Sequence, residues 1–320
     1  MDILFIADPL DAFKIYKDTT FAMMSEAARR GHRIHACEVS DLALADGRVE
    51  ASTRQIEIVA DKDHAGPSPW YRAQPARIEG LERYDAVLMR KDPPFDMEYV
   101  TATWMLEHAE RHGARIFNKP RAIRDHSEKF AIAEFADFVA PTLVTRDPKR
   151  LRAFQETHGD VILKPLDGMG GMGVFRVRAD GMNLGSIIET LSDNGARSVM
   201  AQKFIPAISE GDKRILLIGG KPVPYALARI PQGNEVRGNL AAGGLGVARE
   251  LTAYDRKIAE TLAPVLSARG LLLVGLDVIG ESLTEVNVTS PTCFREITEQ
   301  TGFDVPAMFV DALEAAVASS

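Results

Sequence analysis

The hydrophobic positions in the first part of the chain predict strands that alternate with helices. Residues 3–7 form a short apolar run that predicts a buried strand, and Thr20 to Arg30 has the apolar spacing of a helix that ends at Gly31. Ile34 to Val39 predicts a second strand. Because strands joined by a helix usually lie parallel in one sheet, this opening predicts an α/β domain.

A further predicted strand, Tyr84 to Met89, leads into the loop Arg90–Asp96, which has the sequence RKDPPFD. The carboxyl end of a parallel strand is where open α/β sheets place ligands. Turn formation by the two prolines explains the same loop equally well. We expect the first domain to end near residue 124. Its other predicted elements are a hairpin turn at Asp46-Gly47, a surface loop over 61–75, a helix over 98–112 and a short strand over 115–117.

Residues 125–205 predict a small α+β unit. Ser127 is expected to cap a helix that runs to about Ala136. The remaining elements expected here are strands over 141–145, 161–164, 174–178 and 198–205, and helices over 151–158 and 183–194.

Residues 206–320 predict a larger third unit. It is expected to contain strands over 214–218 and 223–229, a helix over 252–270, a hairpin over 271–288 and a final helix over 306–317. The glycine-bearing segment Ile230–Gly246 is predicted to be a loop. Structureless loops of this length are usually functional lids or disordered, and we expect a lid over residues 230–246.

Composition limits the classes of function. A chain of 320 residues with 46% hydrophobic and 26% charged residues is typical of a soluble globular protein of about two domains. The net charge of −7 gives no reason to expect nucleic acid or an anionic membrane as partner. No apolar run approaches the roughly 18 residues of a transmembrane helix. The two cysteines, Cys37 and Cys293, lie far apart, which favours a reducing cytoplasmic setting.

A glycine-rich stretch between two predicted strands is the first candidate site. Lys164 ends an apolar run, and a loop with four glycines follows it, at Gly168, Gly170, Gly171 and Gly173. Backbone N–H groups of such a loop can surround a phosphate, and the lysine adds a positive charge. The spacing also fits G-x-G-x-x-G, but a strand follows where a dinucleotide-binding fold requires a helix. An ordinary hairpin loop remains the alternative.

The predicted hairpin over 271–288 carries the second signal. Glu285 and Asn287 are two residues apart on one strand, so both project from the same face. With a turn at Gly280–Ser282, Ile279 would oppose Leu283 and Asp277 would oppose Glu285. Three oxygen donors would then converge, as Mg²⁺ prefers. The polar, solvent-facing side of a sheet is the alternative explanation.

Several long motifs together resemble the bacterial glutathione synthetases, a family of ATP-grasp ligases. They are MRKDPPFD at 89–96, ILKPLDGMGG at 162–171, ARIPQG at 228–233, RGNLAAGG at 237–244 and TEVNVTSPT at 284–292. The resemblance implies an α/β and α+β chain in which an N-terminal Rossmann-like domain (1–124) precedes a small (125–205) and a large (206–320) ATP-grasp subdomain. It implies that ATP phosphorylates a carboxyl group of γ-glutamylcysteine and that glycine attacks the acyl phosphate.

The resemblance also implies roles for single residues. Arg214, Arg229 and Arg237 would be catalytic, and Asp277, Glu285 and Asn287 would bind Mg²⁺, with Mn²⁺ as an alternative. The substrate residues would be Arg214, Arg229, Asn287, Ser290, Pro291 and Thr292. The ATP site would comprise Lys129, Lys164, Asp167, Gly168, Gly170, Gly171, Gly173, Gln202, Lys203, Phe204, Ile205 and Asp212.

The family further implies a homotetramer. Leu245 occupies a position where relatives can have arginine, which puts in doubt a charge contribution from the far end of the lid. Two other functions stay open on the sequence. One is a ligase of the same fold that joins a different carboxylate and acceptor, and the other is an ATP-binding module without catalysis.

Overall fold

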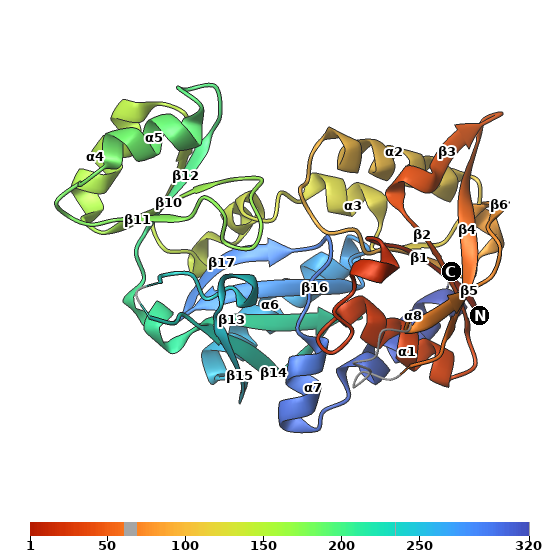
Figure 1. Cartoon of the computed structure of the whole chain (residues 1–320). Coiled ribbons are helices and arrows are strands. Elements are labelled where there is room, and N and C mark those ends of the chain that lie inside the picture. Colours follow the sequence, from red (N-terminus) through yellow and green to blue (C-terminus); the bar gives the residue numbers. More distant parts are fainter. Residues whose placement is uncertain (61–68, 234, 320) are drawn as a thin grey trace.

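The computed structural model describes residues 1–60, 69–233 and 235–319, whose strands form three sheets (Figure 1). The first has the strand order β3-β4-β2-β1-β7-β8, with β5 and β6 also paired to β4. Its strands are β1 (Asp2–Ile6), β2 (Arg33–Cys37), β3 (Leu42–Ala45), β4 (Arg48–Ile58), β5 (Tyr71–Ala73), β6 (Arg77–Gly80), β7 (Ala86–Met89) and β8 (Ile116–Phe117).

The first sheet is parallel only in its centre. β2, β1, β7 and β8 run parallel, as the strand–helix–strand pattern predicts, whereas the long strand β4 pairs antiparallel with β2, β3, β5 and β6. The predicted turn at Asp46-Gly47 joins β3 to β4. The predicted loop over 61–75 is wrong where Tyr71–Ala73 forms β5, and residues 61–68 lie outside the described part of the chain.

Alternate residues of β1 pack into two different cores. Ile3 and Phe5 belong to a cluster that includes residues of α1 and α8, whereas Leu4 and Ile6 belong to one that includes residues of α2 and α3. The helices of these two cores that flank the first sheet are α1 (Thr19–Arg29), α2 (Met97–Arg111), α3 (Pro120–Asp125) and α8 (Val305–Ala318). The first and last helices therefore pack together, and the two chain termini lie on the same side of the molecule (Figure 1).

The second sheet has its own core and stands apart from the rest of the ribbon at the upper left of Figure 1. Its order is β11-β10-β12-β9, and all its pairs are antiparallel. Its elements are β9 (Thr142–Thr145), α4 (Pro148–His158), β10 (Val161–Pro165), β11 (Phe175–Val177), α5 (Leu184–Ser192) and β12 (Val199–Lys203).

The segment before the second sheet differs from its prediction. The structure has a 3₁₀ segment, η4 (Phe130–Phe138), where an α-helix capped by Ser127 was expected. Phe135 has φ −120° and ψ 46°, which interrupts the helical backbone, and no side chain caps the start of the segment. The other 3₁₀ turns are η1 (Leu10–Ala12), η2 (Val39–Asp41), η3 (Leu81–Arg83), η5 (Pro206–Glu210) and η6 (Leu240–Ala242).

The third sheet, with the order β15-β14-β13-β16-β17, is covered on both faces. Ile215 and Leu217 pack in the cluster that contains residues of α6, and Leu216 and Ile218 pack in the cluster that contains residues of α7 and α8. The elements are β13 (Asp212–Ile218), β14 (Lys221–Ile230), β15 (Leu245–Glu250), α6 (Ala253–Ala268), β16 (Leu273–Ile279), β17 (Ser282–Asn287) and α7 (Phe294–Thr301). Arg214 has the same parity as Leu216, so it projects from the face opposite α6.

The segment predicted as a lid is more ordered than expected. Leu245 begins the edge strand β15 and pairs with Ile230 at the end of β14, and η6 lies between the two strands. The prediction of a structureless segment over the whole of Ile230–Gly246 is therefore wrong at its carboxyl end. No helix among the described residues is both long and apolar enough to cross a membrane.

Candidate active site

The hairpin β16–β17 brings two of the predicted metal ligands together. Asp277 pairs with Glu285, and Asn287 lies two residues further along the same strand. The turn is tighter than predicted, because Ile279 pairs with Ser282, but an extra residue at Thr284 restores the predicted partnership. The expectation that Asp277 opposes Glu285 is confirmed.

Two arginines converge on the Asp277 carboxylate. Arg214 donates its Nε to Oδ1 at 2.5 Å and its Nη2 to Oδ2 at 3.1 Å, and Arg229 Nη2 lies 2.8 Å from Oδ2. All three side chains are almost fully buried. Burial alone would raise the pKa of Asp277, but the charges of the two arginines and their hydrogen bonds lower it well below its usual range. Asp277 is therefore an anion at neutral pH.

Asp212 offers an unused acceptor beside this cluster. Its Oδ2 lies 2.5 Å from Arg229 Nη2, while its Oδ1 is buried without a hydrogen-bond partner among the described residues. Burial raises the pKa of Asp212, and the charge of Arg229 opposes that shift. A buried acceptor is costly to leave unsatisfied, so this atom fits a hydroxyl or another donor from a bound molecule.

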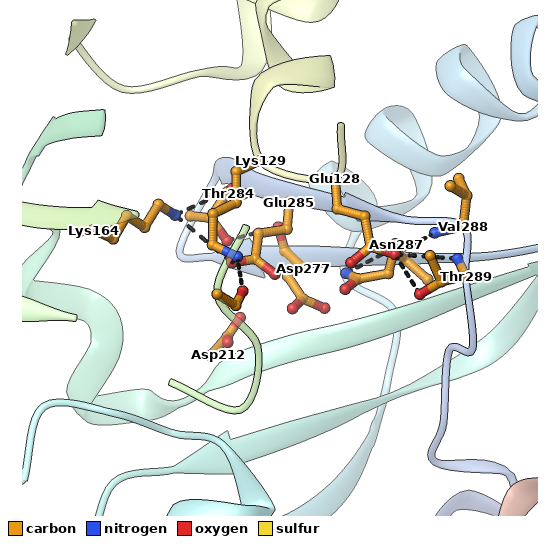
Figure 2. A network of polar contacts seen from close by, with 12 residues as sticks. Glu128, Lys129, Lys164, Asp212, Asp277, Thr284, Glu285, Asn287, Val288 and Thr289 are labelled. Atoms are coloured by element: carbon orange, nitrogen blue, oxygen red, sulfur yellow. Dashed lines mark hydrogen bonds and ion pairs between the residues drawn. The ribbon is translucent and has the colours of Figure 1, made fainter. Parts of the chain in front are cut away.

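Two buried lysines face Glu285 from different elements, as Figure 2 shows. Its Oε1 lies 3.5 Å from Lys129 Nζ and 3.8 Å from Lys164 Nζ. Lys164 Nζ also reaches the carbonyl oxygen of Thr284 at 3.5 Å, and burial lowers its pKa. Two ammonium groups share one carboxylate here, which leaves positive charge for a further anion such as a phosphate.

A pocket with about 840 Å³ of empty space, partly open to solvent, lies between the second and third sheets. The glycine-rich loop forms one wall, which Gly170 and Gly171 line with positive φ, whereas Gly173, also with positive φ, lies outside the lining. The other predicted site residues that line it are Lys129, Lys164, Gly168, Gln202, Lys203, Phe204, Ile205, Asp212, Arg237, Asp277 and Glu285. Asp167 is exposed and lies 4.0 Å from Arg197, outside this lining.

The last residues of β12 and those directly after it also line the pocket. Gln202 donates its amide to Thr142 Oγ1 at 3.0 Å, and Phe204 donates its backbone N–H to the carbonyl of Asp160 at 2.9 Å. The Arg176 guanidinium lies 3.7 Å from the centre of the Phe204 ring and pairs with Asp160. These contacts hold Phe204 in place beside the pocket.

Arg237 connects the predicted lid to the glycine-rich loop. It pairs with Glu235 and places its Nη1 3.4 Å from the carbonyl oxygen of Gly171. A Cβ at Gly171 would lie 2.9 Å from Arg237 Cδ and 2.7 Å from Asn239 Oδ1. Only glycine allows the two loops to approach this closely.

The predicted substrate residues after β17 lie against the first sheet and outside the main pocket. Ser290 donates its hydroxyl to Asp92 Oδ1 at 2.5 Å, and Arg90 Nη2 donates to the carbonyl of Pro291 at 3.1 Å. Thr292 Oγ1 lies 3.7 Å from Cys293 Sγ. The loop Arg90–Asp96 is thus in contact with the residues that follow β17.

The donor set fits Mg²⁺ in its chemistry. Asn287 Nδ2 donates to the carbonyl of Gly275 at 3.2 Å, which leaves its Oδ1 as an acceptor near the Glu285 and Asp277 carboxylates (Figure 2). Among the described residues, no three His, Cys, Asp or Glu side chains form a metal cluster. Two protein carboxylates and one amide suit a cation that takes its other ligands from water and phosphate.

Sequence patterns alone do not reveal some residues that shape the site. Thr284 is the extra residue that sets the hairpin register, Arg176 holds Phe204, and Glu128 contacts the end of β17. The partners of Arg176 and Glu128 are distant in the sequence, whereas Thr284 acts through a register shift within its own hairpin. The only local signal was the position of Glu128 directly before Lys129.

Two solved structures share this arrangement of sheets. The ATP-grasp ligase PsnB complexed with minimal precursor, Mg and ADP matches with a TM-score of 0.63, at 18% identity, over 99% of this chain and 98% of that chain. The D-cycloserine synthetase DcsG matches with a TM-score of 0.66, at 16% identity, over 98% of this chain and 99% of that one. The fold is therefore that of the ATP-grasp ligases.

The family follows from closer similarity. A family model for the prokaryotic glutathione synthetase N-terminal domain matches residues 1–124, and one for its ATP-grasp domain matches residues 128–302. The glutathione synthetase of Ralstonia nicotianae is 66% identical over 316 residues, which cover 99% of this chain and 96% of that protein. The chain belongs to the prokaryotic glutathione synthetase family and is an ATP-dependent carboxylate–amine ligase. The resemblance inferred from the motifs is confirmed.

Proposed function

We propose that this chain joins γ-glutamylcysteine to glycine, with ATP as the energy source, and releases glutathione, ADP and phosphate. The convergence of Lys129 and Lys164 on Glu285, directly beside the Asp277–Arg214–Arg229 cluster, is the observation that carries the proposal. The two lysines suit nucleotide phosphates, and the two arginines suit a carboxylate. The identity of 66% to a glutathione synthetase over nearly the whole chain supports the choice of substrates.

The reaction requires activation of a carboxylate, which does not react with an amine by itself. An oxygen of the cysteinyl carboxylate attacks the γ-phosphorus of ATP, and the bond to the bridging oxygen breaks to release ADP. The glycine amine then attacks the acyl carbon of the resulting acyl phosphate. Phosphate leaves with the former carboxyl oxygen, and the amine loses a proton to give the amide.

The nucleotide is proposed to lie along the pocket described above. Lys129 and Lys164 would hold its phosphates, and the loop Asp167–Gly173 would cover them with backbone N–H groups. The backbone of Gln202–Ile205 would contact adenine beside the Phe204 ring. The Oδ1 of Asp212, which has no hydrogen-bond partner among the described residues, would accept a hydrogen bond from a ribose hydroxyl.

Arg214 and Arg229 are proposed to bind the reacting carboxylate and to stabilise charge on the transferred phosphoryl group. A guanidinium can bind a carboxylate through two parallel hydrogen bonds, as Arg214 binds Asp277. Both arginines are buried and already oriented by Asp277 and Asp212. Such preorganisation is the usual source of electrostatic catalysis.

Asp277, Glu285 and Asn287 are proposed to hold Mg²⁺, with Mn²⁺ as an alternative. The ion, when bound, reduces the charge repulsion between the carboxylate and the triphosphate. The chain's own contribution is to hold two carboxylates and one amide oxygen on one face of a hairpin.

The substrate is proposed to extend from this centre towards Ser290, Pro291 and Thr292. Arg237 and its segment would close over the pocket, because an acyl phosphate must be kept from water. We further propose a homotetramer, by family resemblance, and a cytoplasmic location, which the two distant cysteines favour. The proposed subdomain boundaries remain near residues 124 and 205.

The test is product formation with purified protein, ATP and Mg²⁺. We expect phosphate release only when γ-glutamylcysteine and glycine are both present, and a product with the mass of glutathione. Lys164→Ala should abolish both signals. Release with other amino acids but not with glycine would favour a ligase with a different acceptor. No release with any pair would support an ATP-binding module without catalysis.

A further inference from the structure

Glu128 is a partly exposed residue in the short segment between α3 and η4, next to Lys129 in the sequence. Its side chain points to the end of β17, as Figure 2 shows. None of the roles proposed above uses it. Its contacts nevertheless reach the residues on which the proposed metal and substrate sites depend.

One carboxylate oxygen of Glu128 accepts three hydrogen bonds. Oε1 receives the backbone N–H of Val288 at 3.0 Å, the backbone N–H of Thr289 at 3.1 Å and the hydroxyl of Thr289 at 2.8 Å. The backbone carbonyl of Glu128 accepts a fourth, from the N–H of Val286 at 2.8 Å. Burial raises the pKa of Glu128, and these donors act in the opposite direction. Several hydrogen bonds to one carboxylate form a strong and directional tie.

These bonds surround Asn287. Val286 and Val288, the residues on either side of it, both donate their backbone N–H to Glu128. The backbone of Asn287 is therefore fixed at both ends, and its amide is directed by the further bond to Gly275. The same bonds set the path of the chain into Ser290, two residues beyond Val288.

The neighbouring residue reaches the other half of the site. Lys129 Nζ donates to the carbonyl of Gly168 in the glycine-rich loop and lies 3.5 Å from Glu285. The consecutive residues Glu128 and Lys129 thus contact β17, the residues after it and the glycine-rich loop. Glu128 has the geometry of a support for this junction, whereas Lys129 is placed to touch the nucleotide.

We propose that Glu128 is a positioning residue that holds Asn287 and the chain after it in the register required for binding the peptide and the metal-bound nucleotide. The proposal rests on the function proposed above. Glu128 acts through Asn287, Val288 and Thr289 and contacts no substrate itself. Its loss should therefore impair peptide and metal recognition more than binding of the nucleotide alone.

Glu128→Ala removes the acceptor and tests the proposal directly. We expect the KM for γ-glutamylcysteine to rise about 30-fold because three hydrogen bonds to one carboxylate are lost. The Mg²⁺ concentration for half-maximal enhancement of ADP binding should rise about tenfold, since Asn287 loses its support. The affinity for ADP without metal should stay within about twofold of the wild type.

Two further variants keep the test decisive if Glu128→Ala does not fold. Glu128→Gln retains an oxygen that can accept the three bonds, and its KM for the peptide should stay within about threefold of the wild type. Glu128→Asp keeps the charge but is one methylene shorter, so we expect a KM close to that of the alanine variant. Glu26→Ala is the matched control, because Glu26 is a buried glutamate in α1 whose side chain pairs with Arg29 and Arg30 of the same helix end.

A purely structural role predicts a different pattern. Glu128→Ala and Glu128→Asp would then lower stability, as we expect of Glu26→Ala, but leave the KM and the Mg²⁺ dependence of ADP binding unchanged. That pattern would overturn the proposal. If the wild type forms no product from γ-glutamylcysteine and glycine, the proposed function fails. The Mg²⁺ dependence of ADP binding then still decides whether Glu128 positions β17.

Discussion

Replacement of Arg214 by methionine tests the buried charge cluster most severely. Methionine preserves much of the apolar stem but cannot donate hydrogen bonds to Asp277. In the wild type, Arg214 binds both carboxylate oxygens, and Arg229 binds only one of them while also pairing with Asp212. The variant leaves the buried carboxylate of Asp277 and the partly buried carboxylate of Asp212 with a single arginine.

The expected loss of stability follows from the loss of one of the two arginines that neutralise Asp277 and Asp212. Removing one partner of a buried ion pair typically costs about 3–5 kcal/mol, and because Arg229 still contacts Asp277 we expect about 3 kcal/mol. The lowered pKa of Asp277 adds a pH dependence. A carboxyl group whose pKa is lower in the folded than in the unfolded state stabilises the folded protein at pH values above its unfolded-state pKa of about 4. This stabilisation is lost as the pH falls and the carboxylate becomes protonated. The difference between variant and wild type should therefore shrink below about pH 4.

Urea denaturation at several pH values measures the effect, with Arg269→Met as the control. Arg269 pairs with Glu134 at the surface, where an ion pair is worth about 0–1 kcal/mol. If Arg214→Met loses no more stability at pH 7 than this control, the argument from buried charge is wrong. A difference that grows as the pH falls would contradict the assigned direction of the Asp277 pKa shift.

Three further substitutions test other parts of the site. Glu285→Gln should abolish ligation, by at least about 100-fold in kcat, with urea unfolding still cooperative; near-normal turnover would remove Glu285 from the site. Gly171→Ala should raise the KM for ATP about tenfold and reduce the protection that bound ATP and substrate give to residues 235–244 against proteolysis. Gly243→Ala is the control: Gly243 also has positive φ, but no atom lies within 4 Å of the added Cβ, so neither quantity should change. Arg176→Ala should raise the KM for ATP about fivefold at unchanged kcat, by freeing the Phe204 ring; an unchanged KM would refute that role.

The elements with clear periodicity could be predicted from the sequence. The helix expected over Thr20–Arg30 is α1, the apolar run at 3–7 overlaps β1, and the run at 84–89 contains β7. Edge elements were missed for a physical reason. β15 is partly exposed along its length, so its burial imposes no hydrophobic alternation. Likewise, η4 has a kink at Phe135 that depends on tertiary packing and leaves no local signal.

In the candidate site, the placement of residues within one hairpin could be predicted from the sequence, whereas contacts between strands that are distant in the sequence could not. The two-residue period of a strand placed Glu285 and Asn287 on one face, and Asp277 lies opposite Glu285 as predicted because the extra residue at Thr284 compensates for the misplaced turn. The same reasoning could not reveal that Arg214 and Arg229 meet at Asp277, because their contact depends on the register between β13, β14 and β16. Contacts of that kind are fixed by the folded sheet.

Transfer of oxygen from the carboxyl group to phosphate tests the proposed reaction most directly. γ-Glutamylcysteine labelled with ¹⁸O in the cysteinyl carboxyl group would be incubated with ATP, Mg²⁺, glycine and the wild-type protein. Attack of that carboxylate on ATP predicts one ¹⁸O atom in each phosphate released, together with glutathione that retains the other. Phosphate without ¹⁸O would show that ATP is hydrolysed by water and would contradict the acyl-phosphate route.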